Sequence, residues 1–155
     1  MIDINVKING TNYSLKVEPM RRLIDILRED LKITGSKEGC GEGECGACSV
    51  IMNNSLTLAC LTIASQIDNA EILTVEGVVK EAPYIEKSFI ESGAVQCGFC
   101  TPGFIVSTYH YITNGGDKNE ENIKHRLSGN FCRCTGYAKI ITGVQNAIDY
   151  KTGAK

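Results

Sequence analysis

Alternation of apolar and polar residues marks the start of the chain as β-structure. Residues 2–8 place isoleucine or valine at every second position, and the turn sequence Asn9-Gly10 follows. Because this dipeptide tolerates the positive φ angles of a tight hairpin, a second strand is expected at 15–17. The helical spacing of apolar residues predicts a short helix over 23–31. Further short apolar runs, each typical of a strand, lie at 50–52, 56–58 and 72–75.

After Pro83 the hydrophobic period changes from that of strands to that of helices. Thr101-Pro102 is typical of a helix start, with threonine as N-cap and proline at the first helical position. Asp117 and Glu120 have the spacing of a capping box. A linker is expected at 78–82, between the two patterns. The apolar stripes predict four helices, at 84–93, 101–115, 117–129 and from Tyr137 onward.

The two patterns predict an α+β protein, with a sheet domain at 1–78 and an all-α four-helix domain at 79–155. The eight cysteines divide equally between these domains. A domain of roughly 60 residues buries only about 60% of the surface of its unfolded chain. A bound metal would therefore matter to the stability of each half.

Charge and composition exclude several classes of function. The 155 residues include 16 basic and 18 acidic ones, which leaves no basic excess to bind nucleic acid or an anionic membrane. No stretch approaches the ~20 apolar residues of a membrane-spanning helix, and the N-terminus lacks a secretory pattern. We therefore expect a cytoplasmic protein. Because the cytosol keeps thiols reduced, its eight cysteines indicate metal ligation or redox chemistry.

The first four cysteines have the spacing of a plant-type ferredoxin. They read Cys40-x4-Cys45-x2-Cys48, with eleven residues before Cys60. This spacing is typical of a 2Fe-2S cluster, in which each iron takes two thiolates. Interleaved glycines let the backbone fold tightly and aim N–H groups at the cluster sulfurs. These glycines are Gly39, Gly41, Gly43 and Gly46.

The last four cysteines form two short pairs, each expected just before a helix. Cys97-x2-Cys100 precedes the helix at 101, and Cys132-x-Cys134 precedes a helix expected to open near Thr135. The partial positive charge and free N–H groups of a helix N-terminus stabilise thiolates and an anionic cluster. The sequence therefore predicts a second 2Fe-2S cluster between these two pairs.

Structural zinc is an alternative at both sites, because four thiolates can also bind zinc in a tetrahedron. The protein would then be a zinc-stabilised scaffold without redox activity. Disulfides lack support from a secretory signal. A thioredoxin-like dithiol at Cys97 and Cys100 is disfavoured by the second cysteine pair. A Rieske-type site is disfavoured because His110 and His125 lie in predicted helices, away from the cysteines in sequence.

The remaining polar residues indicate no catalytic constellation. No Ser/His/Asp set, phosphate-binding loop or pair of carboxylates stands out, so we expect no catalytic residues in this chain. Arg21-Arg22 is interpreted as surface charge. Arg133, between two cysteines, is interpreted either as offsetting cluster charge or as an exposed cation that contacts a partner.

Three motifs together resemble the iron-sulfur subunit of the molybdenum hydroxylases. This family includes xanthine dehydrogenase, aldehyde oxidoreductase, nicotinate dehydrogenase and aerobic-type carbon monoxide dehydrogenase. The resemblance covers essentially the whole chain and includes every expected cysteine, while Ser49 stands where threonine is common. The motifs are Glu38-Gly39-Cys40-Gly41-Glu42-Gly43-Glu44-Cys45-Gly46-Ala47-Cys48, Gln96-Cys97-Gly98-Phe99-Cys100-Thr101-Pro102-Gly103 and Cys132-Arg133-Cys134-Thr135-Gly136-Tyr137.

The resemblance implies a β-grasp ferredoxin-like domain followed by a four-helix domain, each with one 2Fe-2S cluster. It implies a large molybdopterin-binding subunit, where substrate is hydroxylated, and a medium FAD-binding subunit as separate polypeptides. Electrons would pass from molybdenum through the C-terminal and then the N-terminal cluster to FAD. The xanthine dehydrogenase type is favoured, with nicotinate, aldehyde and carbon monoxide dehydrogenases as alternatives.

The resemblance also implies roles for individual residues. Gln96 matches the family glutamine that hydrogen-bonds the pterin, and Cys134 matches the cluster ligand nearest to it. Gly43 and Gly46 are expected on the side that faces the flavin. All eight cysteines are expected as metal ligands: Cys40, Cys45, Cys48 and Cys60 for one cluster, and Cys97, Cys100, Cys132 and Cys134 for the other.

Overall fold

A five-stranded mixed sheet forms most of the N-terminal half in the computed structural model, which describes residues 1–154. Lys155, the last residue of the predicted second domain, lies outside the described residues. The strand order is β2-β1-β5-β3-β4, in which only β1 and β5 are parallel neighbours. All five predicted strands are present. Their bounds are β1 Ile2–Ile8, β2 Thr11–Val17, β3 Ser49–Met52, β4 Ser55–Leu58 and β5 Glu71–Leu73.

The first hairpin forms as its sequence predicts. Asn9 and Gly10 adopt φ angles of 50° and 83°, the left-handed conformations that a tight turn requires. The turn pairs Ile8 with Thr11 and sets the register of β1 and β2. In this register the alternating apolar side chains of β1 are buried on one face, where they begin the core of the sheet half.

A short helical segment covers the buried face of the sheet. It begins as α1 (Leu23–Asp25) and continues as a π-helical turn, η1 (Ile26–Asp30). The π-turn is closed by a hydrogen bond from the Leu31 N–H to the Ile26 carbonyl. The apolar side chains of this segment are fully buried against the strands and against Cys48 and Cys60. A short 3-10 turn, η2 (Ala64–Gln66), completes this half.

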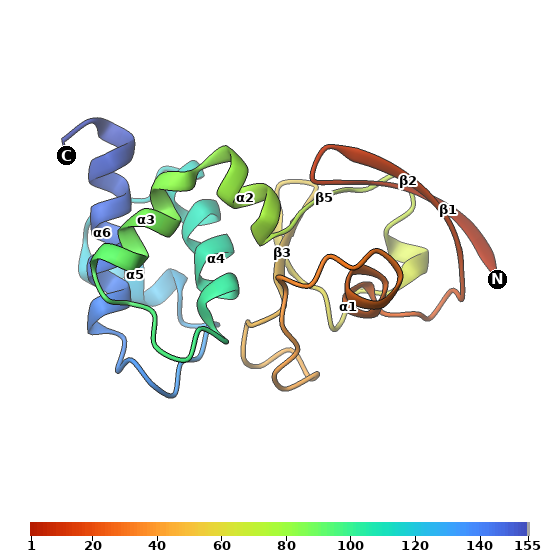
Figure 1. Cartoon of the computed structure of the whole chain (residues 1–155), viewed down its shortest axis with the longest axis horizontal. Helices are drawn as coiled ribbons and strands as arrows, with labels where there is room; N and C mark the ends of the chain where they lie inside the picture. Colours follow the sequence, from red (N-terminus) through yellow and green to blue (C-terminus); the bar gives the residue numbers. More distant parts are fainter. Residues whose placement is uncertain (155) are drawn as a thin grey trace.

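The C-terminal half contains five helices within the described residues, not the four that were predicted (Figure 1). The additional helix is α2, which occupies most of the expected linker at 78–82. Val75 and Val78 bury the helix against the core of the helical half, which explains why this stretch is folded. The boundary expected between 78 and 79 therefore crosses a helix. The five are α2 Val75–Glu81, α3 Pro83–Glu91, α4 Thr101–Thr113, α5 Glu120–Arg126 and α6 Ala138–Thr152.

Three helix starts differ in detail from the prediction. Cys100, not Thr101, occupies the N-cap position of α4. Asn119 caps α5, because its side chain accepts hydrogen bonds from two backbone N–H groups, whereas Asp117 instead accepts from the Asn119 N–H. Tyr137, with a φ of 70°, precedes α6, so that this helix opens later than expected.

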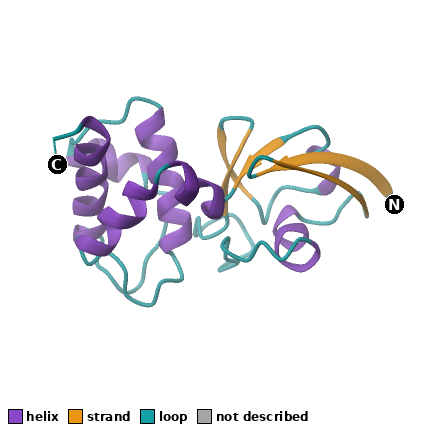
Figure 2. Ribbon diagram, turned by 45° about the horizontal axis from the view of Figure 1, so that its top comes forward, coloured by secondary structure: helices purple, strands orange, loops and turns teal. Residues whose placement is uncertain are grey.

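The two halves lie end to end, with the helices at one end and the sheet at the other (Figure 2). Each half has its own buried cluster of apolar side chains. Helix α4 packs on β3 at the junction, and Ile51 of β3 belongs to the core of the helical half. Within residues 1–154, no helix is both long and apolar enough to cross a membrane.

Candidate metal centres

The first four cysteines come together as two pairs of thiols. Cys48 and Cys60 are buried, and their Sγ atoms lie 3.3 Å apart. Cys40 and Cys45 lie on the surrounding loop, where their thiols interact directly. The site thus has one buried pair next to the sheet and one pair that is open to solvent on the side of Cys40.

The loop around Cys40 directs backbone N–H groups at its sulfur. The N–H groups of Glu42 and Glu44 donate to Cys40 Sγ at 3.4 and 3.3 Å. Gly41 and Gly43 have φ angles of 70° and 84°, which turn the intervening backbone toward the thiol. The N–H of Glu42 makes the largest contribution to lowering the pKa of Cys40, to about 7. This is the anion-binding arrangement that the interleaved glycines predict.

At the buried end of this site, a thiol pKa is raised rather than lowered. Burial, together with the neighbouring Cys60 thiol, raises the pKa of Cys48 to about 12. Binding of a metal would displace the proton from such a thiol. The first site therefore combines a dry, apolar end with an end that is rich in N–H donors.

The last four cysteines are paired crosswise rather than along the sequence. Cys100 interacts with Cys132, and Cys97 interacts with Cys134. The first of these pairs is half-buried and the second is exposed. Burial and the Cys132 thiol raise the pKa of Cys100 to about 12. Each pair takes one thiol from each segment, so that a metal bound to either pair would join the loop before α4 to the loop before α6.

Cys132 is surrounded by local hydrogen bonds. Burial favours its neutral form, but donation from the Thr135 hydroxyl at 3.1 Å and the Thr135 N–H at 3.4 Å outweighs it and lowers the pKa of Cys132. The N–H of Cys132 donates to the Tyr137 hydroxyl at 3.0 Å. The ring of Tyr137 packs edge-on against Phe104 of α4. These contacts hold the loop in place before α6 begins at Ala138.

The paired arrangement distinguishes between the two kinds of metal centre. A structural zinc site needs four ligands round a single ion, whereas each iron of a 2Fe-2S cluster takes two thiolates. Two pairs of thiols in each half are therefore the arrangement that a binuclear cluster takes.

The two expected flavin-facing glycines lie in different environments. Gly43 is half-buried, and a Cβ at this position would overlap the exposed side chain of Leu61. Gly46 is buried against Gly129 and Asn130 of the helical half. Residues of this chain cover Gly46, and the expectation that it lies on the side facing a partner's flavin stays a prediction.

Gln96 and Cys134 lie at one edge of the helical half. Both residues are exposed, and contact between the Cys134 and Cys97 thiols brings Cys134 close to the residue that follows Gln96. The structure thus brings these two predicted residues together. His110 lies near Asn54 on the opposite part of α4, and His125 lies in the last turn of α5.

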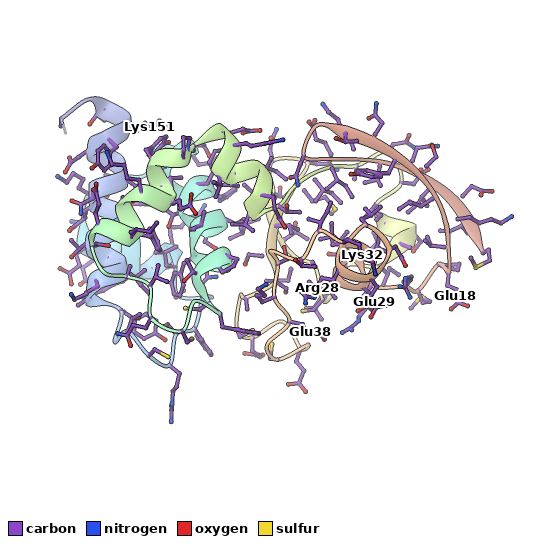
Figure 3. The ribbon with its side chains drawn as sticks, viewed as in Figure 1. Glu18, Arg28, Glu29, Lys32, Glu38 and Lys151 are labelled. Carbon is purple, nitrogen blue, oxygen red and sulfur yellow. The ribbon has the colours of Figure 1, made fainter. Side chains whose placement is uncertain are left out.

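Two arginines that support the first cysteine loop were missed by sequence reasoning. Arg22 donates to both oxygens of Asp25 and to both oxygens of Glu38, although it was interpreted as surface charge. Arg28 donates to the carbonyls of Thr34 and Ser36 at 2.7 and 2.8 Å. Figure 3 shows Arg28 on the helical turn and Glu38 where the loop begins. The sequence feature that could have indicated the Arg22–Glu38 contact is the position of Glu38, two residues before Cys40.

Comparison with known proteins agrees with the division into two metal-binding halves. Residues 6–65 match the model of a 2Fe-2S iron-sulfur cluster binding domain, and residues 74–145 match the model of a 2Fe-2S binding domain. The nicotinate dehydrogenase small FeS subunit of Eubacterium barkeri is 45% identical over 150 residues, which are 96% of each chain. The chain belongs to the small iron-sulfur subunits of the molybdenum hydroxylases.

Further proteins are similar to this chain in sequence or in structure. A probable xanthine dehydrogenase subunit from Bacillus subtilis is 39% identical over 86% of this chain and 78% of that protein. The quinoline 2-oxidoreductase structure from Pseudomonas putida 86 matches with a TM-score of 0.90 and 34% identity, over 98% and 97% of the two chains. The aldehyde oxidoreductase structure from Desulfovibrio desulfuricans has a TM-score of 0.95 and 37% identity. This small chain spans only 18% of that longer one.

Proposed function

We propose that this subunit transfers electrons within a molybdopterin-dependent hydroxylase, from molybdenum on a large partner subunit to FAD on a medium partner subunit. The observation that carries the proposal is the arrangement of the eight cysteines as two pairs of thiols in each half. A 2Fe-2S cluster supplies one-electron redox chemistry when it is bound. Two such clusters in one small chain are suited to electron transfer rather than to substrate chemistry.

The proposed ligands follow from these pairs. In the sheet half, Cys40 with Cys45 would hold one iron, and Cys48 with Cys60 the other. The N–H groups that point at Cys40 would stabilise negative charge on the thiolate. In the helical half the proposed ligand pairs are Cys97 with Cys134 and Cys100 with Cys132.

The two exposed pairs suggest where the partners bind. We place the molybdopterin subunit at the exposed edge with Gln96, Cys97 and Cys134. We place the FAD subunit at the exposed end of the first site, where Gly43 packs beside Leu61. Leu61 is 57% exposed, an apolar surface that a partner would cover. The chain would then join the two partners, each at one of its own exposed cysteine pairs.

The type of hydroxylase is proposed from the relatives. A nicotinate dehydrogenase subunit is 45% identical to this chain, and a probable xanthine dehydrogenase subunit is 39% identical. We therefore propose a hydroxylase of nitrogen heterocycles, of the nicotinate or xanthine dehydrogenase type. An aldehyde or carbon monoxide dehydrogenase remains the alternative. The large subunit would select the substrate, and the cytoplasm is the proposed compartment because free thiols persist there.

Metal analysis and spectroscopy test this proposal directly. The full chain, produced anaerobically with sufficient iron, is expected to be brown and to contain about four irons and four acid-labile sulfides. Reduction should give two distinguishable EPR signals. A colourless protein with stoichiometric zinc would contradict the proposal and favour a zinc-stabilised scaffold. Co-purification of the chain with a molybdopterin protein and a flavoprotein tests the proposed partners.

A further inference from the structure

A buried asparagine connects the two cysteine sites across the junction between the halves. Asn130 is 5% exposed and lies two residues before Cys132. Its Nδ2 group donates to the Gly46 carbonyl at 3.1 Å, and its Oδ1 accepts from the Ser107 hydroxyl at 2.7 Å. One side chain thus contacts the loop of the first site and the helix that begins at the second.

The backbone packs too closely here to allow other side chains at the neighbouring positions. A Cβ at Gly46 would overlap the Gly129 carbonyl and the Asn130 amide. A Cβ at Gly103, in the first turn of α4, would overlap the Gly46 carbonyl. The two halves therefore touch backbone to backbone at this point, which leaves little room for one to shift against the other.

Each part of this contact is joined to a proposed metal ligand by a short length of chain. Gly46 follows Cys45 directly, and Ser107 lies on α4, which has Cys100 at its N-cap. Beside Asn130, the Phe131 N–H donates to the Cys45 carbonyl at 3.0 Å. A displacement at Asn130 would therefore move ligands of both sites at once.

We propose that Asn130, together with Gly46, Gly103 and Ser107, fixes the distance and orientation between the two cluster sites. This group is called the Asn130 latch. Asn130 acts here as a positioning residue, and the proposal rests on the proposed function, in which both sites hold 2Fe-2S clusters. The step that it supports is a one-electron exchange, in which one site is oxidised as the other is reduced and no bond forms or breaks.

The polar chemistry of the latch favours this role over simple adhesion between the halves. A buried amide is costly unless it is hydrogen-bonded, and here both ends of the amide are satisfied by partners on different elements. An apolar side chain would fill the same space without defining an orientation. The directional bonds of Asn130 instead specify one arrangement of the loop against the helix.

The test compares Asn130→Ala with Asn119→Ala in the full chain loaded with both clusters. Asn119 caps α5 away from the junction, so its loss lowers stability by a different route. Both variants should unfold at lower temperature than the wild type. Only Asn130→Ala should lose or alter the spin–spin interaction between the two reduced clusters in EPR, and only it should slow the exchange of an electron between them.

Unchanged spin–spin interaction and exchange rate in a folded Asn130→Ala protein would overturn the proposal. If this variant does not fold, Ser107→Ala removes one hydrogen bond and keeps the Asn130–Gly46 contact. A smaller change of the same kind is then expected, and wild-type values there would equally refute the latch. Failure of the proposed function is seen separately, because the wild-type chain itself would then show no pair of iron-sulfur signals.

Discussion

Arg22 and Glu38 form a bidentate ion pair beside the first cysteine loop. Nη1 of Arg22 lies 2.6 Å from Oε1 of Glu38, and Nη2 lies 3.2 Å from Oε2. The same guanidinium donates to both oxygens of Asp25, and these two carboxylates raise the pKa of Arg22, with Asp25 as the larger cause. The arginine therefore connects the covering helix to the start of the loop that carries Cys40.

Arg22→Gln is expected to loosen the first site and leave the second unchanged. The ion pair is partly exposed, so we expect a loss of about 1 kcal/mol in the free energy of unfolding. Because Glu38 no longer holds the loop, the first-site EPR signal should broaden. On heating, the first site should also lose its cluster at a lower temperature than in the wild type. Thermal loss of the visible absorbance, followed together with EPR, measures both effects.

Arg21→Gln is the matched control, because Arg21 pairs with Glu29 and Asp30 and not with the loop. This variant should retain a wild-type signal at both sites. Equal effects of the two substitutions on the first-site signal would show that Arg22 contributes only to the general charge of the helix.

Tyr137→Phe is expected to alter the second site alone. The change removes the hydroxyl that accepts from the Cys132 N–H and keeps the ring that packs on Phe104. Loss of this hydrogen bond should cost about 1 kcal/mol and shift the midpoint potential of the second site in a redox titration. Tyr109→Phe, which loses a contact with Glu81 in the same half, should leave both potentials unchanged.

Local patterns were sufficient to predict most of the secondary structure. The alternation in 2–8 and the Asn9-Gly10 turn are short-range signals, and the structure contains the hairpin that they predict. Helix α2 was missed because Gly77 and adjacent valines have low helix propensity. Its stability comes from burial of Val75 and Val78 in the tertiary core, which a local pattern does not report.

At the candidate sites too, local sequence patterns did not predict contacts between distant parts of the chain. The cysteine spacings placed the thiols in two groups of four, one in each half. Crosswise contact of Cys97 with Cys134 depends on how two distant loops pack, and the spacing carries no such information. The burial of Gly46 likewise depends on Asn130, 84 residues further along the chain. The Cys97–Cys134 contact and the burial of Gly46 both depend on packing between segments far apart in the chain, which is why sequence reasoning missed them.

Serine substitutions test the crosswise pairing in the helical half. Because Cys97 and Cys134 interact, Cys97→Ser and Cys134→Ser should disturb the same iron and give similar changes in the second EPR signal. The double variant should be little worse than either single variant. The first-site signal should stay largely intact in all three. Loss of the first signal alone would contradict the assignment of the ligand sets.

Gly43→Ala should perturb the first site, whereas Gly10→Ala should lower stability without doing so. Both glycines have positive φ angles, 84° and 83°, so each alanine variant should lose about 1 kcal/mol through backbone strain. At Gly10 there is open space for the new methyl group, but at Gly43 it would overlap Leu61. Either the exposed Leu61 side chain or the loop must then shift, and a shift of the loop would carry the Glu44 N–H away from Cys40. We therefore expect an altered first EPR signal only in Gly43→Ala. In the double variant Gly43→Ala/Leu61→Ala the overlap is removed, so the wild-type signal should return. Failure of the double variant to restore the signal would show that strain, and not the contact with Leu61, controls the geometry of the loop.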